Sequence, residues 1–354
     1  MTAIFLAFIR SFVRDRPGLA MTLLLPPLVF LLFAAIFGGS ARGEIDSSVV
    51  IFDAAPTARS LAFRQGLAQI YGDRLTGVES LVQLEQAVAS GRADAGVVVH
   101  RGGGAEPRVE LVTGAGREIA ANALSGQIES VAELARGRAP PGKTVDHRTV
   151  GPVGDFQAVY YAGAVSIMFV FFAAMHGAMA GLDERRSGLQ ARLSLLAGGL
   201  APVMAGRLAA LTAIGTAQTG IVFAFAYARL PPLQPWQVLA WLVTALLAAV
   251  AAAGLGLAII SACRTRGQAQ PLSTFIVLLL AALGGSMAPR YLMPDVFRQL
   301  GWATPHAWVI EAHQSVLWLG QFSGGVGAAW AVLAAIGALG YAVALQLERR
   351  QMRT

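Results

Sequence analysis

The chain has 354 residues, of which 55% are hydrophobic and only 13% are charged, and its mean hydropathy is +0.59. Globular chains in water carry about 25% charged residues, so this composition excludes an ordinary water-soluble protein and indicates an integral membrane protein. The formal net charge is +7, and Cys263 is the only cysteine, which excludes an intrachain disulfide.

The N-terminal segment alternates apolar side chains with arginines at helical spacing and ends at Pro17-Gly18. It is too short and too basic to cross a bilayer, which takes about 20 apolar residues. Residues 1–18 are therefore predicted to form an amphipathic helix on the cytoplasmic membrane surface. Residues 19–39 are predicted to be the first transmembrane helix. The alternative, a cleaved signal peptide, would have a shorter apolar core of about 7–15 residues.

Residues 40–156 differ in kind, because charged residues, glycine and proline become frequent there. The periodicity predicts strands at 48–52, 95–99 and 108–112 and helices at 57–70, 79–90 and 118–136. This segment is predicted to be a mixed α/β domain outside the cytoplasm, of ordinary domain size.

Five further apolar runs are long enough to cross a bilayer, at 157–181, 208–228, 236–262, 271–288 and 324–346. A charged loop, 182–207, separates the first two, and 347–354 is a cytoplasmic tail. The predicted fold is an α-helical integral membrane protein with six transmembrane helices. The mixed α/β extracytoplasmic domain is inserted between helices 1 and 2.

Residues 289–323 are apolar but interrupted by prolines and rich in tryptophan, which favours the membrane–water interface. They are predicted to form an outer re-entrant hairpin that does not cross the bilayer and acts as an outer gate. The candidate gate residues are Pro289, Pro294, Pro305 and Trp308.

The distribution of basic residues predicts the orientation. With the N-terminus inside, the cytoplasmic segments carry twelve basic residues and the short outer loops carry three. By the positive-inside rule, both termini lie in the cytoplasm and the α/β domain lies outside. The positive charge is thus explained by topology, and no nucleic-acid partner is expected.

Two motifs suggest chemistry that their context does not support. Residues 137–144, GRAPPGKT, match the phosphate-loop pattern, but Pro140 and Pro141 lack the N–H groups that bind phosphate, so a linker is the preferred interpretation. His306, Glu311 and His313 are near one another in sequence, but their spacing does not place three metal ligands on one helical face. They are interpreted as residues that anchor the outer hairpin at the membrane interface.

The second predicted span has two different faces. One carries small residues, including Gly177 and Gly181, whose spacing lets two helices approach closely. The other carries bulky side chains, which either pack against neighbours or border a substrate path. His176 is an ionisable residue within this span, which suggests function, and the alternative is simple solvation near the cytoplasmic end. The candidate path residues are Met168, Phe172, Met175, His176 and Met179.

The loop 182–207 is longer than a simple return to the membrane requires, and we interpret it as a small cytoplasmic helix. It contains the pattern Glu-Arg-x-x-Gly, followed by a leucine and a Gly-Arg pair. A second set of motifs precedes the last span. The residues are Glu184, Arg185, Gly188, Leu193 and Gly206-Arg207, then Gly284-Gly285, Pro289, Met293-Pro294 and Pro305–Trp308. In this order they resemble the membrane subunits of type-2 ABC exporters, and the layout resembles that family's large-ectodomain branch. Leu189 and Ala197 depart from the threonine and proline common there.

The resemblance implies a permease subunit of an ATP-driven exporter in a bacterial inner membrane, with no catalysis of its own. Separate ABC ATPase subunits would bind ATP and Mg and dock on the loop, so no cofactor is expected in this chain. The implied coupling residues are Glu184, Arg185, Arg186, Gly188 and Leu193. The expected partners are the ATPases, a second copy or a sister permease, and the lipid bilayer, with room for a periplasmic adaptor. The alternatives are a secondary transporter and a membrane-anchored sensor or binding protein.

Overall fold

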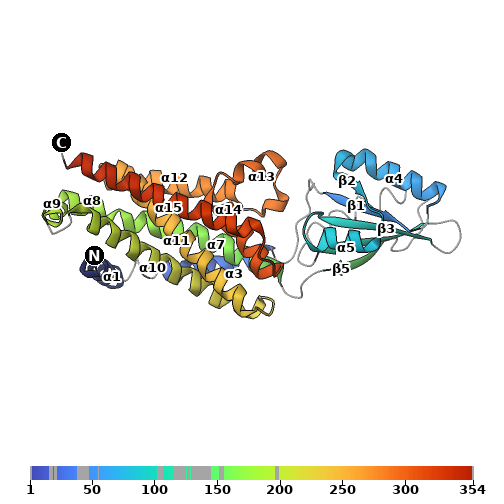
Figure 1. Cartoon of the computed structure of the whole chain (residues 1–354), viewed down its shortest axis with the longest axis horizontal. Coiled ribbons are helices and arrows are strands. Elements are labelled where there is room, and N and C mark those ends of the chain that lie inside the picture. Colours follow the sequence, from blue (N-terminus) through green and yellow to red (C-terminus); the bar gives the residue numbers. More distant parts are fainter. Residues whose placement is uncertain are drawn as a thin grey trace. The chain divides into compact units, whose positions relative to one another are not determined.

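The computed structural model forms two compact units, a helical unit and a sheet unit (Figure 1). The helical unit comprises Met1–Ala35, Ala158–Arg290 and Asp295–Thr354, and the sheet unit comprises Ile36–Gln157 and Tyr291–Pro294. The structure describes residues 2–15, 19, 22–37, 48–54, 56–101, 107–114, 125, 128, 145–150, 155–195 and 199–352.

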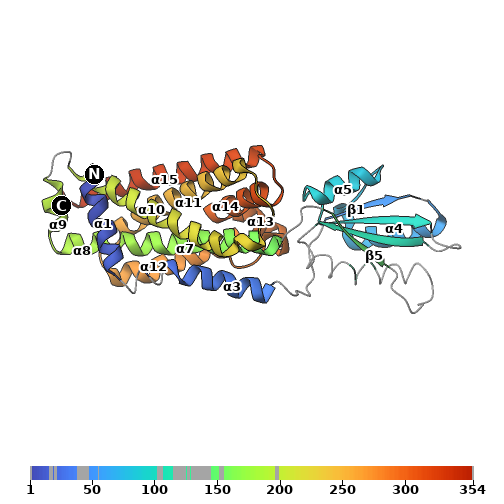
Figure 2. The same cartoon turned by 90° about the horizontal axis from the view of Figure 1, so that it is seen from below.

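Five long helices make up most of the helical unit and run side by side in both views (Figures 1 and 2). They are α7 (Phe156–Ala178), α10 (Leu200–Ala226), α11 (Pro235–Ala262), α12 (Arg266–Gly284) and α15 (Gly324–Gln351). Within the described residues, these five are the helices long and apolar enough to cross a membrane, α7 continuing into the short helix after it.

The N-terminal helices are shorter. α1 (Thr2–Arg14) runs across the ends of the long helices and packs beside α10 (Figure 2). α3 (Leu25–Phe37) has 13 residues and carries the pair Pro26-Pro27 in its first turn, where proline is tolerated because the first amides have no helical partner. At about 1.5 Å per residue, α3 is shorter than the hydrocarbon core of a bilayer. A first span over 19–39, and hence a total of six, stays a prediction.

Several helix ends lie outside the predicted limits. α10 begins at Leu200, α12 at Arg266 and α15 continues to Gln351, so parts of the predicted loop 182–207 and of the tail are helical. Thr265 fixes the start of α12, because its side chain accepts a hydrogen bond from the Gln268 amide at 3.2 Å. Hydropathy marks only the part of a helix that suits lipid, whereas backbone hydrogen bonding continues into the polar flanks.

α11 and α15 approach each other through glycines. A Cβ built on Gly254 would lie 2.3 Å from the carbonyl oxygen of Gly337, and one on Gly340 would lie 2.5 Å from the carbonyl carbon of Gly254. Small residues at these positions let the two backbones touch, as in other tightly packed membrane helices. The two helices therefore form one rigid pair.

The segment between α12 and α15 contains η3 (Arg290–Leu292), α13 (Asp295–Gly301), α14 (Pro305–His313) and a π-helical turn at Gln314–Trp318, and none of these is a candidate span. The prediction that His306 and His313 anchor the hairpin at the interface is wrong, since they are 0% and 1% exposed. His306 lies against the ring of Phe171, with centroids 4.9 Å apart, and His313 lies 5.1 Å from the ring of Phe223. Sequence spacing alone did not indicate that α14 would pack against α11, α12 and α15 and place its two histidines against rings of α7 and α10.

The sheet unit has five strands in the order β2-β1-β3-β4-β5. The strands are β1 (Val49–Asp53), β2 (Leu75–Gly77), β3 (Ala95–Arg101), β4 (Pro107–Gly114) and β5 (Val145–Val150). β1 runs parallel to β2 and β3, β3 is antiparallel to β4, and β4 is parallel to β5. The sequence did not predict β2, which has three residues, or β5, which is largely polar and follows the predicted linker 137–144.

Two helices cover the two faces of this sheet. α4 (Ala58–Tyr71) places Phe63 and Leu67 on the face that carries the side chain of Val97, whereas α5 (Leu81–Ala89) places Leu84 on the face of Val98. Alternate residues of one strand point to opposite faces, which is why both helices find an apolar surface. The predicted helix 118–136 lies outside the described residues apart from 125 and 128, and 137–144 lies entirely outside them.

Candidate functional site

Two short helices, α8 (Ala180–Arg186) and α9 (Leu189–Ser194), follow α7 where the sequence predicted one cytoplasmic helix. Gly188 separates them with a φ of +70°, a left-handed conformation that side chains with a Cβ rarely adopt. Leu193 in α9 is half-buried and packs on an apolar cluster to which α7, α8, α10, α11, α12 and α15 contribute. The glycine thus lets the chain turn, and the leucine fixes α9 to the bundle.

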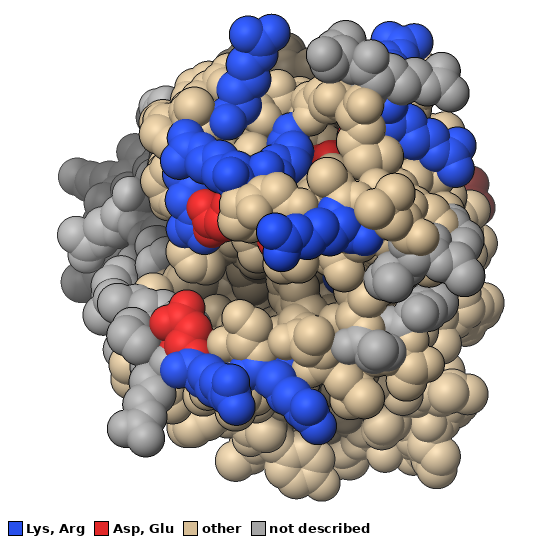
Figure 3. Space-filling view, turned by 90° about the vertical axis from the view of Figure 1, so that its left-hand side faces the viewer, with Lys and Arg blue, Asp and Glu red and all other residues tan. Residues whose placement is uncertain are grey.

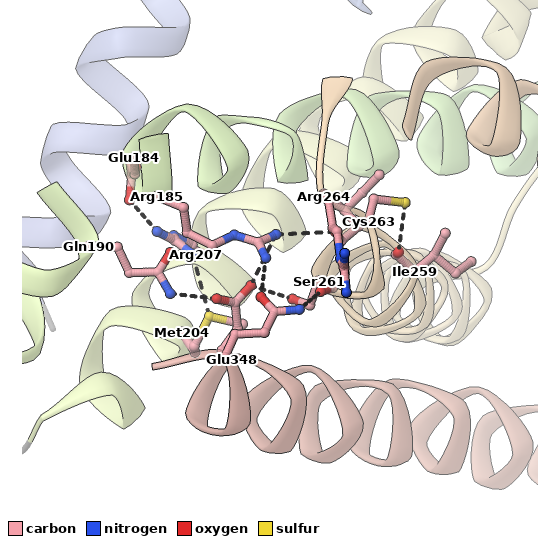
Figure 4. Close-up of polar contacts among 12 residues, drawn as sticks. Glu184, Arg185, Gln190, Met204, Arg207, Ile259, Ser261, Cys263, Arg264 and Glu348 are labelled. Atoms are coloured by element: carbon pink, nitrogen blue, oxygen red, sulfur yellow. Dashed lines mark hydrogen bonds and ion pairs between the residues drawn. The ribbon is translucent and has the colours of Figure 1, made fainter. Parts of the chain in front are cut away.

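Glu348 of α15 is the centre of a polar cluster beneath these two helices (Figure 4). It is 2% exposed, and its carboxylate accepts hydrogen bonds from the hydroxyl of Ser261 in α11 at 2.7 Å and from the side-chain amide of Gln190 in α9. A guanidinium nitrogen of Arg185 in α8 lies 3.7 Å from the same carboxylate. Because a buried charge must be paired and hydrogen-bonded, this one side chain ties α8, α9, α11 and α15 together.

Arg185 strengthens the same connection. Its guanidinium donates to the side-chain oxygen of Gln351 in α15 and to the carbonyl of Ile260 in the last turn of α11, the latter at 3.4 Å. Gln351 in turn donates to the carbonyl of Ser261 at 2.8 Å. The last carbonyls of a helix have no partner within it and carry partial negative charge, so a cation is favourable at this place.

Glu184 is paired within the chain as well. Its carboxylate forms an ion pair with Arg207 of α10, which is 2% exposed and also contacts the sulfur of Met204 at 3.5 Å. A Cβ on Gly181 would lie 3.0 Å from this guanidinium, so a small residue there leaves room for it. The sequence placed Arg207 in the loop, but the helix α10 and the partner Glu184 bury it.

The surface of this end is basic. Figure 3 faces it and shows many more Lys and Arg than Asp and Glu side chains around a central hollow. Among the coupling candidates, Glu184 and Arg185 are partly buried in the contacts above, whereas Arg186 is exposed. The neighbouring exposed residues are Leu189, Arg192, Leu195, Arg264, Arg266, Arg349 and Arg350.

Cys263 lies at the inner side of this cluster, directly after α11, and is fully buried. Burial raises the pKa of the Cys263 thiol, while the nearby Arg185 guanidinium acts in the opposite direction. The thiolate is therefore disfavoured, as in a structural cysteine and unlike a reactive one.

A cavity of about 550 Å³ lies beside α7, close to the end that carries α8. It is lined by four of the five predicted path residues, Phe172, Met175, His176 and Met179, whereas Met168 is not among the lining residues. Nine further residues line the cavity, among them Gln218 of α10 and Ser273 of α12, and none of the nine was among the predicted path residues. The positions of Gln218 and Ser273 on other helices could not be related to α7 without the tertiary structure.

A comparison with family models matches residues 16–345 to the ABC-2 family transporter protein. The chain belongs to this family. The match covers the sheet unit, four of the long helices and most of α15, and it confirms the resemblance seen in the sequence motifs. No curated protein matches the chain.

In this ABC-2 family chain, Arg290 holds the segment that was predicted to be an outer hairpin, and it is 6% exposed. Its guanidinium lies 4.3 Å from the ring centre of Trp302 and 4.0 Å from the Glu311 carboxylate, and its backbone amide donates to the Tyr160 hydroxyl of α7 at 3.0 Å. Trp308, a predicted gate residue, donates from its indole to the carbonyl of Trp302 at 2.8 Å. Arg290 had no motif to single it out in the sequence.

The predicted prolines of the hairpin have different environments. Pro289 is buried, Pro294 is exposed, and Pro305 is buried as the first residue of α14, where its missing amide hydrogen costs nothing. Within the part of the chain that the structure describes, no group of three or more His, Cys, Asp or Glu residues could hold a metal ion.

Proposed function

We propose that this chain is the permease subunit of an ATP-driven exporter, and that α8 and α9 receive force from a separate ATPase subunit. Membership of the ABC-2 transporter family supports a transport role, with ATP hydrolysis in a partner. The observation that carries the coupling role is the Glu348 cluster, which connects the exposed short helices to two of the long ones.

Movement would pass through this cluster to the bundle. A displacement of α8 or α9 would pull on Glu348 and Ser261, and hence on α15 and α11. Because the glycine contacts make α11 and α15 a rigid pair, the two would move together. Transport then requires that the bundle has two discrete packings, between which nucleotide binding shifts the equilibrium.

The docking surface would be the basic end around Arg186. Exposed arginines flanked by the apolar side chains of Leu189 and Leu195 suit a partner surface that combines acidic rim residues with an apolar pocket. Glu184 and Arg185, which the sequence suggested as direct contacts, would instead hold α8 in place from within.

The remaining parts of the assembly follow from this role. The partner ATPase would bind ATP and Mg, and a second copy or a sister permease would complete the transport path. A bacterial inner membrane, export as the direction, and contact of the sheet unit with a periplasmic adaptor belong to the same proposal.

The test uses the chain reconstituted in liposomes with an ABC ATPase that copurifies with it. Arg186→Glu should reduce copurification of the ATPase and permease-stimulated ATP hydrolysis at least about tenfold, because it reverses a charge at the proposed interface. Arg229→Glu is the matched control, since it makes the same change at an exposed arginine of η2 (Tyr227–Arg229), at the opposite end of α10 from α9. Equal stimulation by the wild type and Arg186→Glu would place the docking surface elsewhere.

A further inference from the structure

The cavity beside α7 combines an apolar wall with buried polar side chains. Phe172, Met175 and Met179 of α7 supply apolar surface, and Gln218 and Ser273 reach the same space from α10 and α12. Its volume of about 550 Å³ is within the range of roughly 300–1,000 Å³ that is usual for small-molecule sites.

The two polar side chains have unused hydrogen-bonding groups. Gln218 is 1% exposed and Ser273 is 3% exposed, and neither the amide nitrogen and oxygen of Gln218 nor the hydroxyl of Ser273 has a partner within the part of the chain that the structure describes. The adjacent hydroxyls of Thr219 and Thr274 are satisfied by carbonyls one turn earlier, both at 3.1 Å. An unpaired buried polar group costs about 1–3 kcal/mol, so an occupant that pairs with Gln218 and Ser273 is favoured.

The charge around the cavity limits the chemistry of this occupant. Asp15 and His176 are the ionisable residues among those that line it, and both are exposed. A charged group placed beside Gln218 would therefore be desolvated without a buried counter-ion, which is strongly unfavourable. An amide or hydroxyl that both donates and accepts would pair with Gln218 and Ser273 without that penalty.

We infer that this cavity binds a small amphiphile with an apolar body and an uncharged hydrogen-bonding head, and that Gln218 and Ser273 bind the head. The apolar body contacts Phe172, Met175 and Met179, and methionine side chains adapt readily to different shapes. This inference rests on the proposed transport function, since it names the class of substrate that the path accepts.

The experiment uses the full chain alone in phosphatidylcholine nanodiscs. Three photoreactive probes share one dodecyl diazirine chain and end in an N-methylamide, a trimethylammonium or a plain methyl group. Crosslinks are mapped by mass spectrometry as a function of probe concentration. The amide probe should label the cavity segments of α7, α10 and α12 and should saturate at a concentration about 3- to 10-fold lower than either other probe.

Variants decide whether the head group is recognised. Gln218→Leu and Ser273→Ala should each raise the half-saturating concentration of the amide probe about 3- to 10-fold and leave that of the methyl probe unchanged, which also shows that the cavity is intact. Gln299→Leu, an exposed position on α13, is the matched control. If Gln218→Leu disturbs labelling by every probe, the result with the milder variant Ser273→Ala determines whether the head group is recognised.

Two results would overturn the inference: amide labelling that neither variant changes, or strongest labelling by the ammonium probe that Asp15→Asn abolishes. The assay contains no ATPase, so its failure would leave the coupling role of α8 and α9 standing. Conversely, head-group recognition by a chain that does not stimulate its ATPase would contradict only the proposed function.

Discussion

Glu348 of α15 accepts a 2.7 Å hydrogen bond from the hydroxyl of Ser261 in α11. These residues are 87 positions apart in the chain, and Gln190, the second donor to this carboxylate, is 158 positions away. The contact joins the short helices at the basic end to the tightly packed pair α11 and α15.

Glu348→Ala should lower the free energy of unfolding by about 2–4 kcal/mol, because it leaves Ser261, Gln190 and Arg185 without their buried acceptor. Glu348→Gln keeps one acceptor oxygen and should lose less. The measurement is unfolding of the purified chain in an SDS titration. Gln346→Ala, exposed on the same helix, is the control, and an equal effect of the two alanine variants would show that the cluster contributes nothing.

Gly188→Ala should destabilise the turn between α8 and α9 by about 1–2 kcal/mol, since its φ of +70° is strained for alanine. No described atom lies within 4 Å of a Cβ at this position, so the effect comes from the backbone alone. Trypsin cleavage after Arg186 or Arg192 should become about 5- to 30-fold faster, in proportion to local opening. Gly188→Asn should have a smaller effect because asparagine tolerates this conformation; identical rates for both variants and the wild type would refute the strained turn.

Gly254→Ala should separate α11 from α15, because the added methyl would lie 2.3 Å from the carbonyl oxygen of Gly337. We expect a loss of about 1–3 kcal/mol from overpacking. Gly220→Ala in α10 is the matched control, since no described atom lies within 4 Å of its Cβ, and alanine favours a helix by up to about 1 kcal/mol over glycine. Thermal unfolding compares the two, and a Gly254→Ala variant as stable as Gly220→Ala would contradict the close packing.

Cys263 should react slowly with maleimide in the native chain. Burial raises the pKa of its thiol, so the reactive thiolate is a smaller fraction at a given pH, and labelling should keep accelerating above the ordinary thiol pKa of about 8.5. Because it is the only cysteine, total labelling measures this site directly. Glu348→Ala should speed the reaction by loosening the cluster. Native labelling as fast as that of the SDS-denatured chain would show that the thiol is accessible.

Local patterns were sufficient for much of the fold. The long apolar runs predicted the five long helices, and the alternation of branched residues predicted β1, β3 and β4, because both signals depend on neighbours within one element. β2 and β5 were missed for the same reason: three residues give no period, and a polar strand at the edge of a sheet lacks the apolar alternation. The observed helix ends differ from the predicted ones because capping residues such as Thr265 determine where a helix begins, whereas hydropathy does not.

The sequence by itself determined the class of protein: its composition indicated the membrane, and its ordered motifs indicated the transporter family that residues 16–345 match. Only the tertiary structure decided which polar residues are buried and which side chains they contact. Glu348 stands next to Arg349 and Arg350 in the predicted tail 347–354, and Gln218 lies within the apolar run 208–228. Each acquired its role from side chains on other helices. Packing brings such partners together, and the periodicity within one helix does not indicate it.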